Sequence, residues 1–223
     1  MITASSNQST MPNELEFNEL PIGVNKAVNI KDQKLFNGLS FPLILSPLEV
    51  FKNKDTQFWN DWVKENLKTI ESLLLKYGAI LFRGLPLDTD KDFNEFPRAY
   101  GYQEFPYRGG SAQRRHILGN VYTSNQAPPE IIIPMHHELA YVNDYPHILF
   151  FYCDLPAKEK GDTPIALSNV IYLKMAARQP DFVKRLEKEK LRYVRIARHE
   201  EMLVLGLEGA GNQLPLLIIR RKP

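Results

Sequence analysis

Hydrophobic residues recur at three- and four-residue steps across residues 58–77, and charged residues separate them. This spacing predicts an amphipathic helix, because side chains three or four positions apart share one helix face. Gly78 is suited to a left-handed helix end, and the apolar residues 79–82 that follow predict a short buried strand. The first convincing elements are therefore a helix and a strand that are closely joined.

A second helix is expected up to about residue 100, with Asp88 or Thr89 as its cap. Residues 107–129 are rich in Gly, Ser, Asn, Gln and Pro, which predicts a long loop. The segments with strand-like patterns after this loop are residues 131–135, 147–153, 163–168 and 191–196. Two further helices are expected at about residues 168–178, capped by Ser168, and 180–190, starting at Pro180.

The two ends of the chain differ from its middle in composition. Residues 1–13 are rich in Ser, Thr and Asn, and we expect a disordered arm over residues 1–25. After about residue 197, polar and glycine-containing breaks interrupt the pattern, although residues 216–219 form an apolar run. We therefore expect residues 198–223 to be a divergent tail that does not complete a sheet.

A chain of 223 residues with 43% hydrophobic residues suits one globular domain. The net charge of +2 comes from dispersed charges, so nucleic acid is not an expected partner. No stretch approaches the roughly 18 consecutive apolar residues of a membrane-spanning helix, and a membrane is not expected either. The single cysteine, Cys153, lies in an apolar run and suits a buried thiol in a reducing compartment. With no targeting signal recognisable, the cytoplasm is the default expectation, and the oligomeric state is left open.

The segment PMHHE (134–138) holds the candidate metal ligands His136 and Glu138. Composition alone gives about 0.6 His-x-acid triplets by chance, and His199 starts a second one. The setting favours His136 and Glu138, because residues i and i+2 of a strand project to one side and can reach one metal ion. A mononuclear non-haem iron site uses two histidines and one carboxylate. His137 should point the other way, in a hydrogen-bonded structural or substrate-side role.

Four stretches in a fixed order resemble the clavaminate-synthase-like branch of the taurine/2,4-D dioxygenase (TauD/TfdA) family. They are NVYTSNQAPP (120–129), IPMHHELA (133–140), LFFYC (149–153) and GDTPIALS (161–168). GAILFRG (78–84) is similar to an early strand of the same family. On this resemblance we interpret residues 26–197 as the N-terminal part of a dioxygenase domain.

The resemblance implies an α+β protein with a double-stranded β-helix, a jelly-roll relative, incomplete at its C-terminus and flanked by helices. It implies an oxygenase that uses Fe(II), 2-oxoglutarate and O2 to oxidise a small organic molecule, with His136 and Glu138 as two iron ligands. Thr163 stands where the family holds the cosubstrate with a threonine, although a strand threonine without a ligand is the alternative. Tyr122 and Asn125 match a region that faces the substrate.

Two residues that the family supplies from strands far downstream have no matching position in this sequence. They are the third ligand, a histidine, and the arginine that pairs with 2-oxoglutarate. One hypothesis is that the sequence is a truncated product or gene model of a genuine oxygenase, and a native protein substantially heavier than 25.7 kDa would support the oxygenase interpretation. The alternatives are a non-catalytic remnant that acts only as a binding or interaction protein, and a different metal enzyme that completes its site with His147, with His116 or across a dimer.

Overall fold

The structure is a computed structural model that describes residues 20–26, 30, 33–105, 114–128, 130–141, 145–159 and 161–192, and the backbone of 216–220. The N-terminal elements are β1 (Val24–Lys26), β2 (Lys34–Phe36), β3 (Leu39–Phe41), β4 (Leu43–Pro47), the 3-10 turn η2 (Glu49–Phe51), α1 (Thr56–Tyr77), β5 (Ala79–Arg83) and α2 (Asp90–Arg98). The later ones are β6 (His116–Leu118), β7 (Val121–Tyr122), β8 (Leu149–Cys153), α3 (Ser168–Arg178), α4 (Pro180–Glu189) and β9 (Leu216–Arg220). These elements establish a mixed α+β fold.

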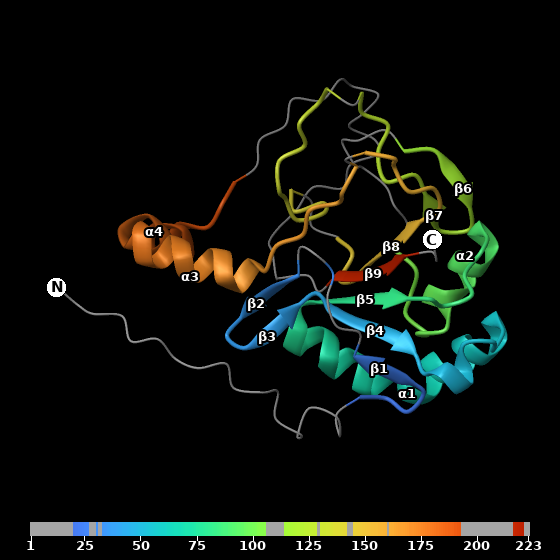
Figure 1. Cartoon of the computed structure of the whole chain (residues 1–223). Helices are drawn as coiled ribbons and strands as arrows, with labels where there is room; N and C mark the ends of the chain where they lie inside the picture. The colour runs from blue at the N-terminus through green and yellow to red at the C-terminus, as the bar shows by residue number, and fades with distance from the viewer. Residues whose placement is uncertain are drawn as a thin grey trace.

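A five-stranded sheet in the order β1-β4-β5-β9-β8 forms the centre of the molecule (Figure 1). β1 runs antiparallel to β4, whereas β4, β5, β9 and β8 are parallel to their neighbours. β4, α1 and β5 make a β–α–β unit, in which the helix connects two adjacent parallel strands. The hairpins β2–β3 and β6–β7 are separate two-stranded sheets, and the described residues do not trace a double-stranded β-helix.

The ends of α1 are set by local chemistry that the sequence makes visible. The Asp55 carboxylate accepts a hydrogen bond from the backbone N–H of Phe58 at 2.9 Å and caps the first turn. Gly78 ends the helix with φ at 76°, and a Cβ at this position would collide with the Leu167 side chain. The predicted helix over residues 58–77 and its stop at Gly78 are confirmed.

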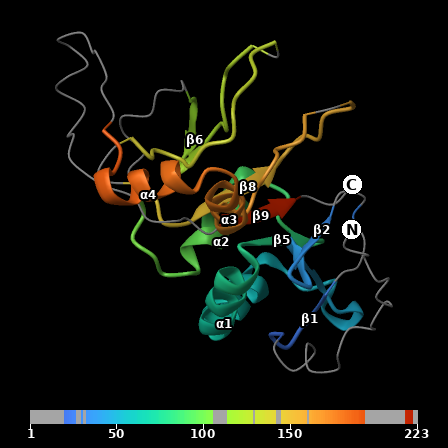
Figure 2. The same cartoon turned by 90° about the vertical axis from the view of Figure 1, so that its left-hand side faces the viewer.

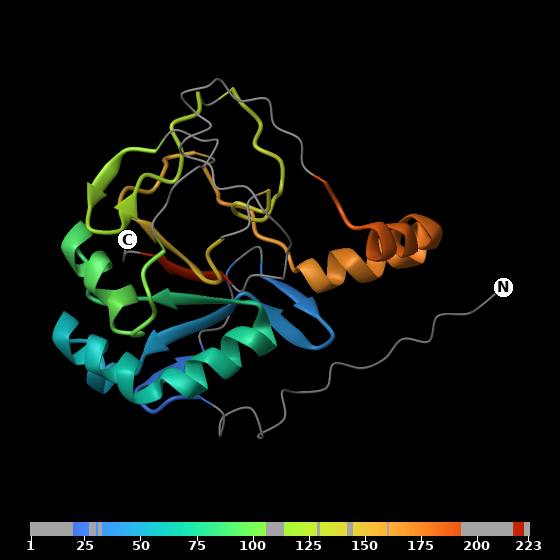
Figure 3. The same cartoon turned by 180° about the vertical axis from the view of Figure 1, so that it is seen from behind.

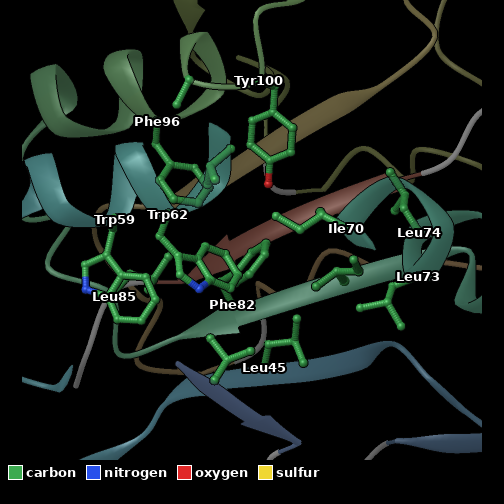
Figure 4. Packing of buried hydrophobic residues seen from close by; sticks show 14 of the residues in the cluster. Leu45, Trp59, Trp62, Ile70, Leu73, Leu74, Phe82, Leu85, Phe96 and Tyr100 are labelled. Atoms are coloured by element: carbon green, nitrogen blue, oxygen red, sulfur yellow. The ribbon is translucent and has the colours of Figure 1, made fainter. Parts of the chain in front are cut away.

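The hydrophobic core lies between α1, α2 and one face of β4 and β5 (Figure 4). Its buried residues include Leu43, Leu45, Trp59, Trp62, Ile70, Leu73, Leu74, Ile80, Phe82, Phe93 and Phe96. The ring of Phe82 on β5 makes edge contacts with Trp62 and Phe96, at centroid distances of 6.3 and 5.8 Å. Ile44 and Leu81, on the opposite face of these strands, are also buried, as expected of a parallel sheet.

α2 and β8 are attached to this core by side-chain contacts. Thr89 and Asp92 form a capping box at the start of α2, which confirms the predicted cap. The Tyr152 ring on β8 stacks on Phe93 at 5.0 Å, and its hydroxyl donates to the Leu87 carbonyl oxygen at 2.8 Å. β8 confirms the core of the strand predicted over residues 147–153.

Several strand predictions are wrong. Residues 131–135 lie outside any strand and are exposed, with Ile132 at 88%, and no strand among the described residues pairs with them. Residues 163–167 are also irregular. Ser168 begins α3 but does not cap it; Leu167 is at the cap position, with no side-chain cap bond. Residues 191–192 are not in a strand, and 193–196 are outside the described residues.

The C-terminal tail does contribute a strand to the sheet, contrary to our expectation. β9 pairs in parallel with β5 on one side, from Ala79 opposite Leu216, and with β8 on the other, from Leu149 opposite Leu216. An unbroken apolar run such as 216–219 is typical of a central parallel strand. Of the expected N-terminal arm, residues 1–19 are outside the described residues, and Val24 belongs to β1 and is buried.

The helices α3 and α4 pack against each other at an outer edge of the molecule (Figures 1 and 3). α3 has no buried residue, and α4 has only Val183. Seen from the side, α1 and the hairpin strand β6 lie on opposite sides of the sheet (Figure 2). None of the helices among the described residues is long and apolar enough to cross a membrane.

Two adjacent tyrosines allow a test of the core. The Tyr100 hydroxyl is buried without a hydrogen-bond partner among the described residues, whereas the Tyr102 hydroxyl donates to Glu71 Oε1 at 2.7 Å. We expect Tyr100→Phe to raise the free energy of unfolding by about 1 kcal/mol, because it removes an unsatisfied buried group. The matched variant Tyr102→Phe should lower it by about 1 kcal/mol. Urea denaturation measures both, and an equal loss of stability in the two variants would contradict the expectation.

Stability should also depend on these tyrosines at alkaline pH. Burial raises the pKa of Tyr100, and burial together with the hydrogen bond to Glu71 raises the pKa of Tyr102. The folded chain therefore holds both protons more firmly than the unfolded chain, and this contribution is complete below about pH 10 and lost as the pH rises further. Urea denaturation between about pH 8 and 11 should show falling stability, and a smaller fall in the Tyr100→Phe/Tyr102→Phe variant. An identical pH dependence would refute the assignment.

Candidate metal centre

His136 and Glu138 lie at the junction between irregular residues 131–137 and a turn over residues 138–141. His136 Nε2 and Glu138 Oε2 are 3.7 Å apart, and the side chains are 56% and 13% exposed. The strand on which we had expected them is absent, but the two side chains still face each other. The His136 side chain is thus largely open to solvent, and the Glu138 side chain is mostly buried.

A backbone contact sets the tautomer of His136. Its Nδ1 lies 2.7 Å from the carbonyl oxygen of Pro134. A carbonyl oxygen only accepts, so Nδ1 carries the hydrogen in this bond and Nε2 of the neutral ring has a lone pair. Metal-binding histidines commonly donate the second ring N–H in this way. With this tautomer, Nε2 offers its lone pair 3.7 Å from Glu138 Oε2, a spacing at which a cation can bind between the two atoms.

The buried side of Glu138 is occupied by Arg114. Arg114 Nη2 donates to Glu138 Oε1 at 3.1 Å, and its side chain is 17% exposed. The carboxylate thus uses Oε1 for the guanidinium, while Oε2 faces His136. Sequence analysis did not single out Arg114 as a functional residue, because the two partners are 24 positions apart.

The spacing of the two donor atoms is compatible with one iron ion. A nitrogen and an oxygen at metal-bond lengths of about 2.1 Å span 3.0 Å at a right angle, so 3.7 Å requires only a small closure of the pair. The described residues contain no group of three or more His, Cys, Asp and Glu side chains that could hold a metal ion. His116 instead contacts Gly119 and the Tyr122 ring, and His147 lies beside Tyr145. Neither histidine completes the site in this structure.

His137 points to a different partner from its neighbours. Its Nε2 lies 2.7 Å from the Ser168 hydroxyl at the start of α3. The bond joins the ligand segment to a helix 31 positions later, which agrees with the hydrogen-bonded role expected for this histidine.

The other predicted site residues are only partly assembled. Thr163 is exposed in the irregular segment before α3. Tyr122 forms part of β7, where its ring lies 5.2 Å from the His116 ring. Asn125 is exposed and its side-chain oxygen accepts from Ala127 N–H at 3.0 Å. Arg114 connects the 121–125 segment to Glu138, because its guanidinium donates both to the Thr123 carbonyl oxygen and to Glu138 Oε1.

Comparison with known proteins identifies the family to which this chain belongs. The family model for the taurine catabolism dioxygenase TauD, TfdA family, matches residues 46–213. The match extends to residue 213, past residue 197, at which we had expected the resemblance to stop. The chain belongs to the TauD/TfdA family.

Two particular relatives have curated names. A clavaminate synthase-like protein of Arabidopsis thaliana is 39% identical over 175 residues, which are 77% of this chain and 53% of that protein. The dapdiamide synthesis protein DdaC of Enterobacter agglomerans is 29% identical over 126 residues, 56% of this chain and 37% of that protein. The chain thus spans about half the length of the plant relative, and less of the bacterial one.

The two candidate ligands should differ in their effect on stability. Glu138→Gln removes a charge partner of the mostly buried Arg114, and we expect the free energy of unfolding to fall by about 1–3 kcal/mol. His136→Ala truncates a largely exposed ring, and the change should stay within about 0.5 kcal/mol. Urea denaturation of both variants checks this order, and a larger loss for His136→Ala would show that the ring has a structural role.

Proposed function

We propose that this chain carries two of the protein ligands of an Fe(II) site in a 2-oxoglutarate-dependent oxygenase that oxidises a small organic molecule. The observation that supports the proposal most directly is the pairing of His136 Nε2 with Glu138 Oε2 at 3.7 Å, with the ring tautomer suited to metal binding. Membership of the TauD/TfdA family supports the same chemistry. The jelly-roll architecture of the complete domain is part of this proposal.

The residues of this chain would have separate roles in binding the metal, the cosubstrate and the substrate. His136 and Glu138 would hold the metal, and the Thr163 hydroxyl would donate to a carboxylate oxygen of 2-oxoglutarate. Tyr122 and Asn125 would face the substrate from the segment that follows β6. The chemistry supplied when iron, 2-oxoglutarate and O2 are bound is the oxidation of a C–H bond in the substrate. A third ligand and a cation for the distal carboxylate of 2-oxoglutarate are also needed, and the proposal assigns neither to a described residue.

Metal titration tests the site before any substrate is known. We expect the wild-type protein to bind Co(II), used as an air-stable stand-in for Fe(II), and His136→Ala or Glu138→Gln to weaken binding by more than about 100-fold, because each removes a direct ligand. His147→Ala is the matched control, since His147 is exposed and lies beside Tyr145. Isothermal titration calorimetry measures the affinities.

The outcomes separate the competing hypotheses. Loss of binding in the two ligand variants alone supports the oxygenase site. Lost affinity in His147→Ala would instead favour a different metal enzyme. A wild-type protein that binds no metal, and does not gain affinity with 2-oxoglutarate, would favour the non-catalytic binding protein. Weaker 2-oxoglutarate binding in Thr163→Val, with unchanged metal affinity, would add Thr163 to the site.

A further inference from the structure

Arg114 makes contacts in two directions at once. Its Nη2 donates to Glu138 Oε1 at 3.1 Å. Its Nη1 donates to the carbonyl oxygen of Ser124 and lies 3.4 Å from that of Thr123. One guanidinium thus joins the candidate metal carboxylate to the segment that carries Tyr122 and Asn125.

We propose that Arg114 is a positioning residue that fixes Glu138 as a one-oxygen metal ligand and couples its orientation to the 121–125 segment. This inference rests on the proposed metal site. It adds a role for a residue that is not itself a ligand and that lies 24 positions from its partner.

The geometry explains how the carboxylate is oriented. A free carboxylate can turn about its last bond and bind a metal through one or both oxygens. Oε1 is held by the guanidinium, and Oε2 is the carboxylate oxygen that lies 3.7 Å from His136 Nε2. The planar guanidinium offers several N–H donors in fixed directions, whereas a lysine ammonium is a point charge on a flexible chain. Arginine therefore suits the site through its shape as well as its charge.

The segment at the other end of Arg114 is held by its own hydrogen bonds. Thr123 N–H donates to the Arg115 carbonyl oxygen at 3.0 Å, and the Thr123 hydroxyl accepts from Arg115 N–H at 2.9 Å. Asn120 N–H lies 3.4 Å from the side-chain oxygen of the buried Asn94, which places the hairpin β6–β7 against α2. A reorientation of the Arg114 guanidinium would consequently shift both the Glu138 carboxylate and the 121–125 segment.

A purely structural ion pair would behave differently. It would lower stability when Arg114 is removed, but metal affinity measured on the folded protein would not change. Nor would metal binding slow amide exchange in the 121–125 segment, because a change at Glu138 would not be transmitted through Arg114 to that segment. Metal affinity and local protection therefore distinguish a positioning role from a structural one.

The experiment compares Arg114→Gln and Arg114→Lys with Arg115→Gln as the matched control. Arg115 is exposed and forms the bonds described above through its backbone alone, so its side chain is dispensable for them. We expect both Arg114 variants to bind Co(II) about 10–100-fold more weakly, as is typical when the partner of a metal ligand is lost. The visible absorption of bound Co(II), which reports coordination number, should also change. Circular dichroism checks that each variant is folded. Arg114→Lys keeps the positive charge beside Glu138, so the comparison can still be made if Arg114→Gln does not fold.

Hydrogen–deuterium exchange supplies the second readout. In the wild-type protein and in Arg115→Gln, Co(II) should slow amide exchange in peptides that cover residues 116–128, and in Arg114→Lys this protection should be lost. Unchanged Co(II) affinity and unchanged protection in Arg114→Lys would overturn the positioning role while leaving the metal site intact. A wild-type protein that binds no Co(II) would overturn the proposed function and, with it, this inference.

Discussion

The packing of α1 against the parallel pair β4–β5 is the constraint on which the rest of the fold depends. Leu43 pairs in register with Ile80 and Leu45 with Phe82, so the four side chains form one face that the tryptophans of α1 cover. Burial of this face supplies the hydrophobic stabilisation, at about 25 cal/mol per Å² of apolar surface removed from water. The same register presents the other edge of β5 to β9, and β9 in turn to β8. The order of the sheet is therefore built outward from one β–α–β unit.

The candidate metal centre is not part of that rigid unit. His136 and Glu138 are in irregular backbone, and their positions depend on side-chain contacts with residues far along the chain. Arg114 holds Glu138 from the hairpin side, and Ser168 holds His137 from the start of α3. Sites on loops are usually less precise than sites on strands, and such cross-contacts compensate for this. The neighbouring side chains of His137 and Glu138 are thus held by one residue that precedes them in the chain and one that follows them.

The sequence predicted those structural features that depend on residues close together in the chain, and it missed most of those that depend on distant partners. The periodicity of residues 58–77, the stop at Gly78 and the cap at Thr89 concern contacts within a few residues, and all were predicted correctly. The hairpin β2–β3 was missed although Asn37 and Gly38, both with positive φ, form a recognisable hairpin turn. Residues 131–135 show the reverse error, because apolar composition cannot reveal whether a pairing strand exists. The role of β9 and the Arg114–Glu138 pair are long-range features, and no local pattern specifies the partner.

The shared carboxylate has a consequence for any metal that binds here. Arg114 neutralises much of the charge of Glu138, so the pair with His136 attracts a cation less strongly than an isolated carboxylate would. The guanidinium weakens the electrostatic attraction for a cation, but it also holds Oε2 toward Nε2. The carboxylate therefore loses less conformational entropy when a metal binds. A site of this kind discriminates by the arrangement of its donors more than by charge. Two such donors leave coordination positions open, and a further protein ligand is required to complete a coordination sphere typical of non-haem iron.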